Sequence, residues 1–334
     1  MSHPTSDHVP SPVRWGILAT GKIADSFADD LALVPDATLA AVGSRSEAGA
    51  RAFADRHDVP RAYGSYAELA ADPDVDVIYV ATPHGRHVED VMLCFEHGKA
   101  VLCEKALTLN ARQSGDLVAE ARKRGLFFAE AMWMRCNPRI RRIQQLVADG
   151  ACGEVRQVRS DLGFALPEQA AARLTDPALG ASALLDVGIY PLTFAYLVLG
   201  EPDDVVASGV LSDLGTDLNG GATLRYANGA VASISWTQVA WSDATASIAG
   251  AEGRIEIPSR MHMPPSVSHV RGWETHTYAD PVIGRGYTHE IVEAGECLRA
   301  GRTESDLLPL DETVAIMALM DRMREQLGVR YAVD

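Results

Sequence analysis

The sequence predicts an α/β protein in which an N-terminal doubly wound parallel sheet is followed by an α+β domain with a mainly antiparallel, open-faced sheet. Three observations lead to this fold class. A glycine-bearing turn joins the first apolar strand to a helix, strands and helices alternate up to residue 135, and beyond Pro138 apolar residues alternate as in strands buried on one face. We therefore expect a loose polar tail over 1–13, a first domain over 14–135 and a second over 136–334.

The composition suits small-molecule chemistry. The 334 residues, 47% of them hydrophobic, can bury a large core, and the formal net charge of −15 argues against the basic surface that nucleic acids or anionic membranes require. Five scattered cysteines without C-x-x-C spacing indicate reduced thiols, and hence the cytoplasm, rather than a disulfide framework or a zinc site. Residues 1–13 hold no apolar segment typical of a secretory signal or membrane span.

The stretch after the first strand has the pattern of a dinucleotide-binding turn. The strand over 15–18 leads into Ala19-Thr20-Gly21-Lys22-Ile23-Ala24, and a helical pattern follows. Glycine lets the backbone approach a pyrophosphate, and the free N–H groups of the helix start attract its charge. Alanine replaces the first and third glycines of the usual spacing, so an ordinary strand–helix turn is the alternative. The predicted contacts are Thr20, Gly21, Lys22 and Ile23.

The next strand indicates which dinucleotide is bound. The strand over 38–42 ends in Gly43-Ser44-Arg45, where an acidic residue would bind the ribose 2′-hydroxyl of NAD. A hydroxyl and a guanidinium suit a 2′-phosphate instead, so Ser44 and Arg45 favour NADP, with NAD as the second possibility. The alternative for Arg45 is a solvated charge at a helix start.

A further apolar strand over 74–82 is typical of a parallel sheet covered on both faces, and it stops at Pro83. His84 and His87 lie beside this stop, but no acidic residue or cysteine completes a metal-ligand spacing. We therefore predict no metal site and place Thr82, Pro83, His84 and His87 beside the nicotinamide.

The run Ala100-Val101-Leu102-Cys103-Glu104-Lys105 organises the first domain. Its first part reads as a buried strand, so Glu104 and Lys105 arrive at the carboxyl edge, where α/β sheets bind ligands. A surface Glu-Lys pair in a turn is the alternative. The nucleotide-binding pattern upstream and a candidate tyrosine downstream favour a catalytic lysine, with both residues near the cofactor.

The last strand of the first domain, over 126–129, is followed by Glu130-Ala131-Met132-Trp133-Met134-Arg135. Trp133 and Arg135 at such a strand end would form a wall of the substrate site. The alternative is a tryptophan that fills the gap between the domains, and the two interpretations are compatible.

The second domain begins with a helix over 139–148 and continues with alternating strands. These are expected over 155–163, 221–226, 230–239, 244–249 and 254–257, and a closing amphipathic helix over about 311–327 packs rather than catalyses. We expect the open face of this sheet to be apolar and to form a homodimer or a higher homo-oligomer.

Between those strands, Asp186 and Tyr190 are four residues apart, which places both on one helix face, although Pro191 interrupts a regular helix there. A core tyrosine with its hydroxyl satisfied by Asp186 is an equal alternative. In hydride transfer, a tyrosine can carry the alcohol proton if a nearby ammonium lowers its pKa, and Lys105 would supply that ammonium. Asp186 would orient the hydroxyl or the substrate.

Taken together, these motifs resemble the Gfo/Idh/MocA oxidoreductases, in particular their branch of sugar and dihydrodiol dehydrogenases. The resemblance covers nearly the whole chain and includes the runs 14–17, 43–45, 63–66, 98–105, 130–133 and 184–190. It implies a Rossmann domain, a sheet domain used in dimerisation, NADP as cofactor, Lys105 and Tyr190 as the catalytic pair, and Asp186, Trp133 and Arg156 near the substrate. The chain departs from the family pattern at Ala106, where proline is usual, and at Ala19.

Two functions follow from these features. The first is an NADP-linked dehydrogenase or reductase that acts on a cyclic polyol, such as an aldose, a keto-sugar or a trans-dihydrodiol. The second is a dinucleotide-binding sensor or regulatory protein without turnover. The presence of Lys105, Asp186 and Tyr190 together favours the enzyme, and neither function involves nucleic acid or a membrane.

Overall fold

The computed structural model describes residues 12–166 and 176–334, and the chain divides into two compact units. The expected tail over 1–13 lies outside the described residues up to residue 11, and Val13 begins the first strand. We call the units the Rossmann unit (Met1–Thr108, Arg112–Cys136 and Val282–Thr313) and the sheet unit (Leu109–Ala111, Asn137–Pro281 and Val314–Asp334).

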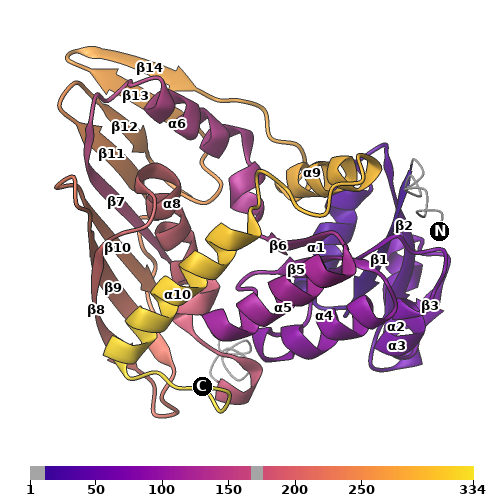
Figure 1. Ribbon diagram of the computed structural model, residues 1–334. Coiled ribbons are helices and arrows are strands. Elements are labelled where there is room, and N and C mark those ends of the chain that lie inside the picture. Colours follow the sequence, from indigo (N-terminus) through magenta and orange to yellow (C-terminus); the bar gives the residue numbers. More distant parts are fainter. Residues whose placement is uncertain (1–11, 167–175) are drawn as a thin grey trace, which may run out of the picture. The chain divides into compact units, whose positions relative to one another are not determined.

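The Rossmann unit is built on a six-stranded parallel sheet in the order β3-β2-β1-β4-β5-β6 (Figure 1). This order reverses direction at β1 and β4, which is the point where doubly wound sheets bind ligands. The parallel sheet predicted from the apolar runs is confirmed. Its strands are β1 (Val13–Leu18), β2 (Ala37–Gly43), β3 (Ala62–Tyr63), β4 (Val77–Val80), β5 (Ala100–Glu104) and β6 (Phe128–Ala131).

Helices connect and cover these strands: α1 (Lys22–Leu31), α2 (Glu47–His57), α3 (Tyr66–Ala70), α4 (His87–Glu96), α5 (Ala111–Arg124) and α9 (Thr288–Arg299). The stretch containing α9 was expected in the second domain, whereas the structure groups Val282–Thr313 with the Rossmann unit. A buried carboxylate explains this return. Asp30 of α1, 1% exposed, accepts hydrogen bonds from the backbone N–H groups of Arg285, Tyr287 and Thr288 and so holds the start of α9.

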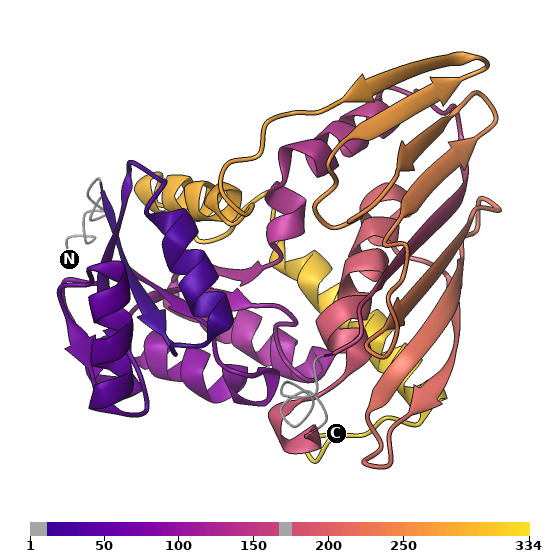
Figure 2. The ribbon, with the colours of Figure 1, turned by 180° about the vertical axis from the view of Figure 1, so that it is seen from behind.

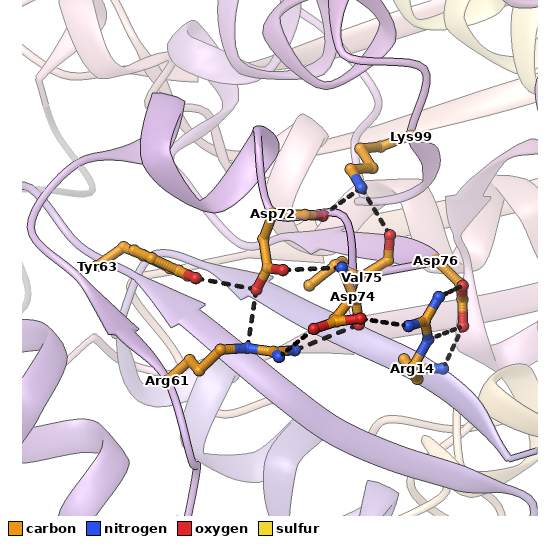
Figure 3. A network of polar contacts seen from close by, with 8 residues as sticks. All are labelled: Arg14, Arg61, Tyr63, Asp72, Asp74, Val75, Asp76 and Lys99. Carbon is orange, nitrogen blue, oxygen red and sulfur yellow. Dashed lines mark hydrogen bonds and ion pairs between the residues drawn. The ribbon is translucent and has the colours of Figure 1, made fainter.

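A polar network lies at the amino edge of this sheet, opposite the carboxyl edge where α/β sheets bind ligands (Figure 3). Arg14 of β1 binds Asp76 and Asp74, and Arg61 binds Asp74 and Asp72. The buried ammonium of Lys99 donates to the carbonyls of Asp72 and Val75, and Tyr63 donates to Asp72. These charges are paired with one another, and they lie away from the carboxyl ends of the strands. The network therefore stabilises the loop over 72–76 and is not a candidate active site.

The sheet unit holds an eight-stranded sheet in the order β14-β13-β12-β11-β7-β10-β9-β8. Only β7 and β10 pair in parallel, so the mainly antiparallel sheet is confirmed. The strands are β7 (Val155–Gly163), β8 (Asp204–Leu211), β9 (Asp217–Arg225), β10 (Val231–Thr237), β11 (Ala246–Gly250), β12 (Arg254–Ile257), β13 (Val267–Arg271) and β14 (Glu274–Tyr278).

The helices α6 (Pro138–Ala148), α8 (Ile189–Leu199) and α10 (Leu310–Leu327) cover one face of this sheet, and the described chain leaves the other face open in both views (Figures 1 and 2). The open face was expected to be apolar, and this holds only at the edge strand β8, where Val206 and Val210 are about 60% exposed. Along the central strands its exposed side chains are polar: Gln157, Arg159, Thr223, Arg225, Ser233 and Ser235. Alternation alone does not reveal which of two half-polar faces is buried.

The helical stretch Pro177–Leu199 is long and apolar enough to span a membrane, but 72% of its most apolar window is buried inside the protein. Within it, α8 packs on β7 and β10. The stretch therefore has the character of a core helix.

Candidate active site

The turn between β1 and α1 has the features of a pyrophosphate site. Gly21 is the N-cap of α1 without a side-chain hydrogen bond to the helix, and a Cβ added there would meet no atom within 4 Å. The first N–H groups of the helix are thus uncapped by a side chain and approachable. Ala19 has a φ of 87°, a left-handed conformation that favours glycine. The usual motif has its first glycine at this position, so the alanine adopts this conformation at an energetic cost.

The end of β2 presents the residues that the sequence assigned to cofactor choice. Ser44 is buried, and its hydroxyl lies 3.4 Å from that of Thr20 in the β1–α1 turn. Arg45 is exposed, and no ion pair holds it within the described part of the chain. A cation that is not already paired is available for a phosphate.

Lys105 follows directly after the last residue of β5, Glu104. The Glu104 carboxylate accepts hydrogen bonds from the Tyr79 hydroxyl, in a very short contact, and from the Lys105 backbone N–H at 3.2 Å. Tyr79 is fully buried and stacks on Phe27 of α1, with ring centroids 3.7 Å apart. Burial, and then the charge of Glu104, raises the pKa of Tyr79 well above its usual value, so this tyrosine stays neutral.

The loop that follows Lys105 is held from two sides. His84 Nε2 lies 3.1 Å from the Lys105 carbonyl oxygen, and His87 Nδ1 lies 3.1 Å from the carbonyl oxygens of Ala106 and Leu107. The Leu107 N–H donates to Glu130 at 2.9 Å, and the peptide bond between Lys105 and Ala106 is cis. Both histidines therefore contact the lysine loop, and their predicted place beside the nicotinamide stays a prediction.

His87 also joins this loop to the segment just after β4, because its Nε2 lies 2.8 Å from the Thr82 carbonyl oxygen. Burial lowers the pKa of His87, which favours the neutral ring. Glu130, buried at the end of β6, accepts a second hydrogen bond from Thr313 at 3.2 Å. Burial raises the pKa of Glu130 to about 7, and the Leu107 N–H, Thr313, Arg135 and Lys105 oppose that rise.

Trp133 and Arg135 lie in a short 3-10 helix after β6, and both are buried. The Trp133 ring packs against Tyr287, with centroids 5.1 Å apart. Arg135 is ion-paired with Glu312 and donates to the Leu307 carbonyl at 2.9 Å. Its guanidinium is thus engaged within the Rossmann unit, and a substrate contact would require it to share these partners.

Asp186 and Tyr190 lie in the sheet unit, at a junction between two kinds of helix. Asp186 is in a π-helical turn, Leu184–Gly188, and Tyr190 is the second residue of α8. Pro191 is the third residue of α8, and because Gly188 and Ile189 both keep helical angles, the helix runs on from the π-helical turn and the proline lies just after that turn. Asp186 accepts a hydrogen bond from Gln238 at 3.1 Å, and the Tyr190 ring packs against His262.

Arg156 is exposed at the start of β7, where it binds Glu154 and the Asn228 carbonyl. The Asp186 partner Gln238 follows the last residue of β10, Thr237, which pairs with Gly163 at the far end of β7. Position 163 lies seven residues beyond position 156 along the strand, or roughly 23 Å away. The structure therefore does not bring Arg156 to Asp186.

Glu130, Gln238 and His262 were not predicted as neighbours of candidate catalytic residues. Glu130 and Gln238 lie at or next to the ends of strands that the sequence predicts, whereas His262 lies in a loop whose path no local pattern predicts. Within 12–166 and 176–334 no group of three or more histidine, cysteine or acidic residues could hold a metal ion.

The comparisons with known proteins show the family to which this fold belongs. Residues 13–131 match the oxidoreductase family with an NAD-binding Rossmann fold, and residues 140–256 match the GFO/IDH/MocA C-terminal domain. Two relatives named trans-1,2-dihydrobenzene-1,2-diol dehydrogenase, from Xenopus laevis and Homo sapiens, are 38% and 34% identical over 330 and 333 residues, which are 95% and 96% of this chain and 99% of each relative.

Solved structures show the same fold. A 3-ketoreductase from Actinomadura kijaniata, in complex with NADP and TDP-benzene, has a TM-score of 0.83 and 26% identity, over 96% of this chain and 99% of that chain. An aldose-aldose oxidoreductase from Caulobacter crescentus has a TM-score of 0.86 and 22% identity, over 95% and 97%. Fold, site and relatives define an oxidoreductase with an NAD(P)-binding Rossmann unit. The chain belongs to the Gfo/Idh/MocA oxidoreductase family, which confirms the resemblance seen in the sequence.

Proposed function

We propose that this protein is an NADP-dependent dehydrogenase or reductase that acts on a cyclic polyol, and that trans-dihydrodiols and aldoses are its substrate classes. The observation that carries the proposal is Lys105, which stands at the carboxyl end of β5 in a chain 34–38% identical, over nearly its full length, to dihydrodiol dehydrogenases. The 3-ketoreductase and the aldose-aldose oxidoreductase among the solved relatives support a substrate with ring hydroxyl groups.

The residues at the β1–α1 turn fit a dinucleotide, because the uncapped start of α1 and the open space at Gly21 accept a pyrophosphate. Thr20, Gly21, Lys22 and Ile23 would hold it, and Ser44 and Arg45 would bind the 2′-phosphate. Thr82, Pro83, His84 and His87 would line the nicotinamide side. Bound NADP would supply hydride exchange with the substrate carbon.

Three residues would perform the acid–base part of the reaction. Tyr190 would take the proton of the substrate hydroxyl, and the Lys105 ammonium would lower the pKa of that tyrosine and bind the same oxygen. Asp186 would orient the substrate through a neighbouring hydroxyl, and Trp133 would give the sugar or diol ring an apolar surface. These roles need Lys105 of the Rossmann unit and Tyr190 of the sheet unit to act on one substrate molecule.

The proposal includes a homodimer in the cytoplasm. A hollow of about 600 Å³ on the open sheet face carries Arg159 together with Asp161 and Glu256. Opposite charges in one patch allow the patch to pair with itself across a two-fold axis, which is the usual symmetry of dimers. The five described cysteines are all free and buried, which suits a reducing compartment.

The test is a turnover assay of the purified protein with NADP and NAD, read by the absorbance of the reduced nicotinamide, against a panel of trans-dihydrodiols, aldoses and inositols. We expect NADP-linked oxidation of at least one member, and loss of that activity in Tyr190→Phe. Tight NADP binding without turnover of any member in either direction would overturn the enzyme and favour the sensor.

A further inference from the structure

The first residue of the π-helical turn Leu184–Gly188, which contains Asp186, donates its backbone N–H to a fully buried carboxylate. Asp217, the first residue of β9, is 1% exposed and accepts three hydrogen bonds. Its donors are the Ser182 hydroxyl at 2.5 Å, the Leu184 N–H at 2.7 Å and the Trp236 indole N–H at 2.9 Å. Burial raises the pKa of Asp217, and these donors oppose the rise. One aspartate thus satisfies a backbone donor at the start of the turn and joins it to β10.

Ser182 extends this contact by one residue. Its hydroxyl oxygen accepts a hydrogen bond from the Leu185 N–H at 3.1 Å, while its carbonyl oxygen accepts one from the Asp186 N–H at 3.1 Å. The N–H groups of Leu184, Leu185 and Asp186 therefore all depend on Asp217 or on the serine that it binds. A helix start with every leading donor engaged is fixed in direction.

Trp236 holds the other end of the turn. A Cβ added to Gly188 would lie 2.9 Å from Cγ of Trp236, and one added to Gly220 of β9 would lie 2.5 Å from Cζ2 of the same ring. The indole thus fits against two positions that have no side chain. Because its N–H is bound to Asp217, the ring cannot slide along this slot without losing a buried hydrogen bond.

Gln238 acts on Asp186 itself. Its backbone N–H donates to the Leu218 carbonyl at 2.9 Å, which places it beside Asp217, and its Nε2 donates to Asp186 Oδ2 at 3.1 Å. A carboxylate only accepts hydrogen bonds, so the amide nitrogen must face Asp186, and the Oε1 atom points elsewhere. Within the described residues that buried oxygen has no hydrogen-bond partner, a cost that a purely structural glutamine would not need to bear.

We propose that Asp217 and Gln238 are positioning residues of the active site: Asp217 sets the π-helical turn, and Gln238 sets the Asp186 carboxylate that the turn presents. This inference rests on the proposed function, which gives Asp186 and Tyr190 their roles toward substrate. π-helical turns recur at functional sites, and this one ends two residues before Tyr190. Relaxation of the turn would redirect both side chains at once.

The first test compares Asp217→Asn with Asp217→Leu. Asparagine can keep all three contacts, because its amide oxygen can accept from Leu184 and Trp236 while its NH₂ donates to Ser182, whereas leucine can keep none. We expect kcat within about threefold of wild type for Asp217→Asn and at least tenfold lower for Asp217→Leu. The Kd for NADP should stay unchanged in both, because the cofactor residues belong to the Rossmann unit.

Hydrogen exchange measures the same turn without any need for turnover. In Asp217→Leu the amides of Leu184 and Leu185 should exchange at least tenfold faster than in wild type, with α8 still protected beyond its first turn. If Asp217→Leu does not fold, Trp236→Phe removes only the indole donor to Asp217, and Ser182→Ala removes the hydroxyl that contacts Asp217 and Leu185. Both variants should show faster exchange in the same direction. Unchanged exchange with unchanged kcat in folded variants would overturn the role of Asp217.

The second test is the steady-state kinetics of Gln238→Leu. Leucine cannot donate to Asp186, so the carboxylate loses the contact that directs it. We expect kcat/KM to fall at least tenfold, while the Kd for NADP, the unfolding midpoint and amide exchange at Leu184 and Leu185 stay unchanged. The matched control is Gln326→Leu, which removes two hydrogen bonds between α10 and β8 in the same unit and should leave kcat/KM within about threefold of wild type. An unchanged kcat/KM in Gln238→Leu would overturn its role. Wild-type protein that turns over no substrate would refute the proposed function instead, while exchange at Leu184 and Leu185 still decides whether Asp217 holds the turn.

Discussion

The ring of His262 packs against the ring of Tyr190, with centroids 5.2 Å apart and planes inclined at 46°. The tyrosine is only 7% exposed, so its ring is held by its neighbours. His262 comes from the loop between β12 and β13, far along the chain. A packed ring permits a clean substitution, because phenylalanine can fill the same space.

The first prediction concerns the catalytic pair. Tyr190→Phe keeps the packing against His262 but removes the proton carrier, so kcat should fall about 10²- to 10⁴-fold while NADP binding and the unfolding midpoint are retained. Lys105→Met should cost at least as much. Since the two residues are proposed to act on one proton, the double variant should lose far less than the product of the single losses.

Steady-state kinetics of the four proteins, with fluorescence titration of NADP, provide the measurement. Full multiplication of the two losses would mean that the residues act independently. If Tyr190→Phe keeps most of its activity with chemistry rate-limiting, the tyrosine is a core residue, and Lys105, His84 or His87 becomes the acid–base candidate.

The second prediction is that Arg45 sets cofactor choice. A partly exposed guanidinium–phosphate contact contributes about 1.5–3 kcal/mol, so Arg45→Ala should weaken NADP binding about 10- to 100-fold and leave NAD nearly unchanged. The control is Arg51→Ala, which removes a neighbouring cation of α2 that is already paired with Glu47. Calorimetric titration of each variant with NADP and NAD measures the two affinities. An equal loss of affinity for NADP and NAD in Arg45→Ala would contradict this role of Arg45.

The third prediction uses the buried Glu130. Its pKa in the folded protein is raised from 4.5 to about 7, so the folded state holds the proton more tightly than the unfolded chain does. Its contribution to stability is therefore full below about pH 4.5 and is lost as pH rises through about 7. Glu130→Gln has no such proton, so wild type should lose stability relative to the variant between pH 5 and 8, by up to about 3 kcal/mol. Urea unfolding at both pH values measures the difference, and a constant gap would contradict the prediction.

The fourth prediction is that a buried acid in α9 limits stability. Glu290 is fully buried, and neither carboxyl oxygen has a hydrogen-bond partner within the described residues. Burial, then the charges of Glu104 and Asp30, raises the pKa of Glu290 well above its usual value. Because an unsatisfied buried carboxyl costs about 1–3 kcal/mol, Glu290→Met should raise the free energy of unfolding by an amount in that range.

Glu293, one turn further along α9, is the matched control for this experiment. Its carboxylate accepts hydrogen bonds from Ser305 at 2.7 Å and Cys297 at 3.3 Å, so Glu293→Met should destabilise the protein. The same sign for both variants in urea unfolding at pH 7 would show that hydrogen-bond satisfaction does not decide stability in this helix.

Particular elements show how far the sequence leads. Strands β7 and β12 were predicted with their observed limits, because their apolar residues alternate and turns bound them. Strand β8 was not predicted. It lies at the sheet edge, and two of its valines, Val206 and Val210, are about 60% exposed, so its apolar residues do not mark one buried face. The return of α9 to the Rossmann unit depends on Asp30, a contact across more than 250 residues that no local pattern records.

The candidate site divides in the same way. Lys105, Arg45 and the β1–α1 turn follow strand ends, and strand ends can be found from apolar runs. The π-helical turn could not be found in that way, because it is set by Asp217 and Trp236 of later strands. Arg156 was named through the resemblance alone, and its position along β7 separates it from Asp186.

The last prediction concerns assembly through the open sheet face. A homodimer through this face needs charges that pair with themselves, and Arg159 lies in one hollow with Asp161 and Glu256. Arg159→Asp would place like charges across a two-fold axis, so we expect the dimer Kd to rise at least tenfold, or about 1.4 kcal/mol, with the unfolding midpoint of the monomer unchanged. Arg51→Asp, on α2 of the Rossmann unit, is the control and should leave the Kd in place. Light scattering and sedimentation over a micromolar dilution series measure both. A wild-type monomer throughout that range would rule out the stable dimer, and a dimer that tolerates Arg159→Asp would place the interface on another surface.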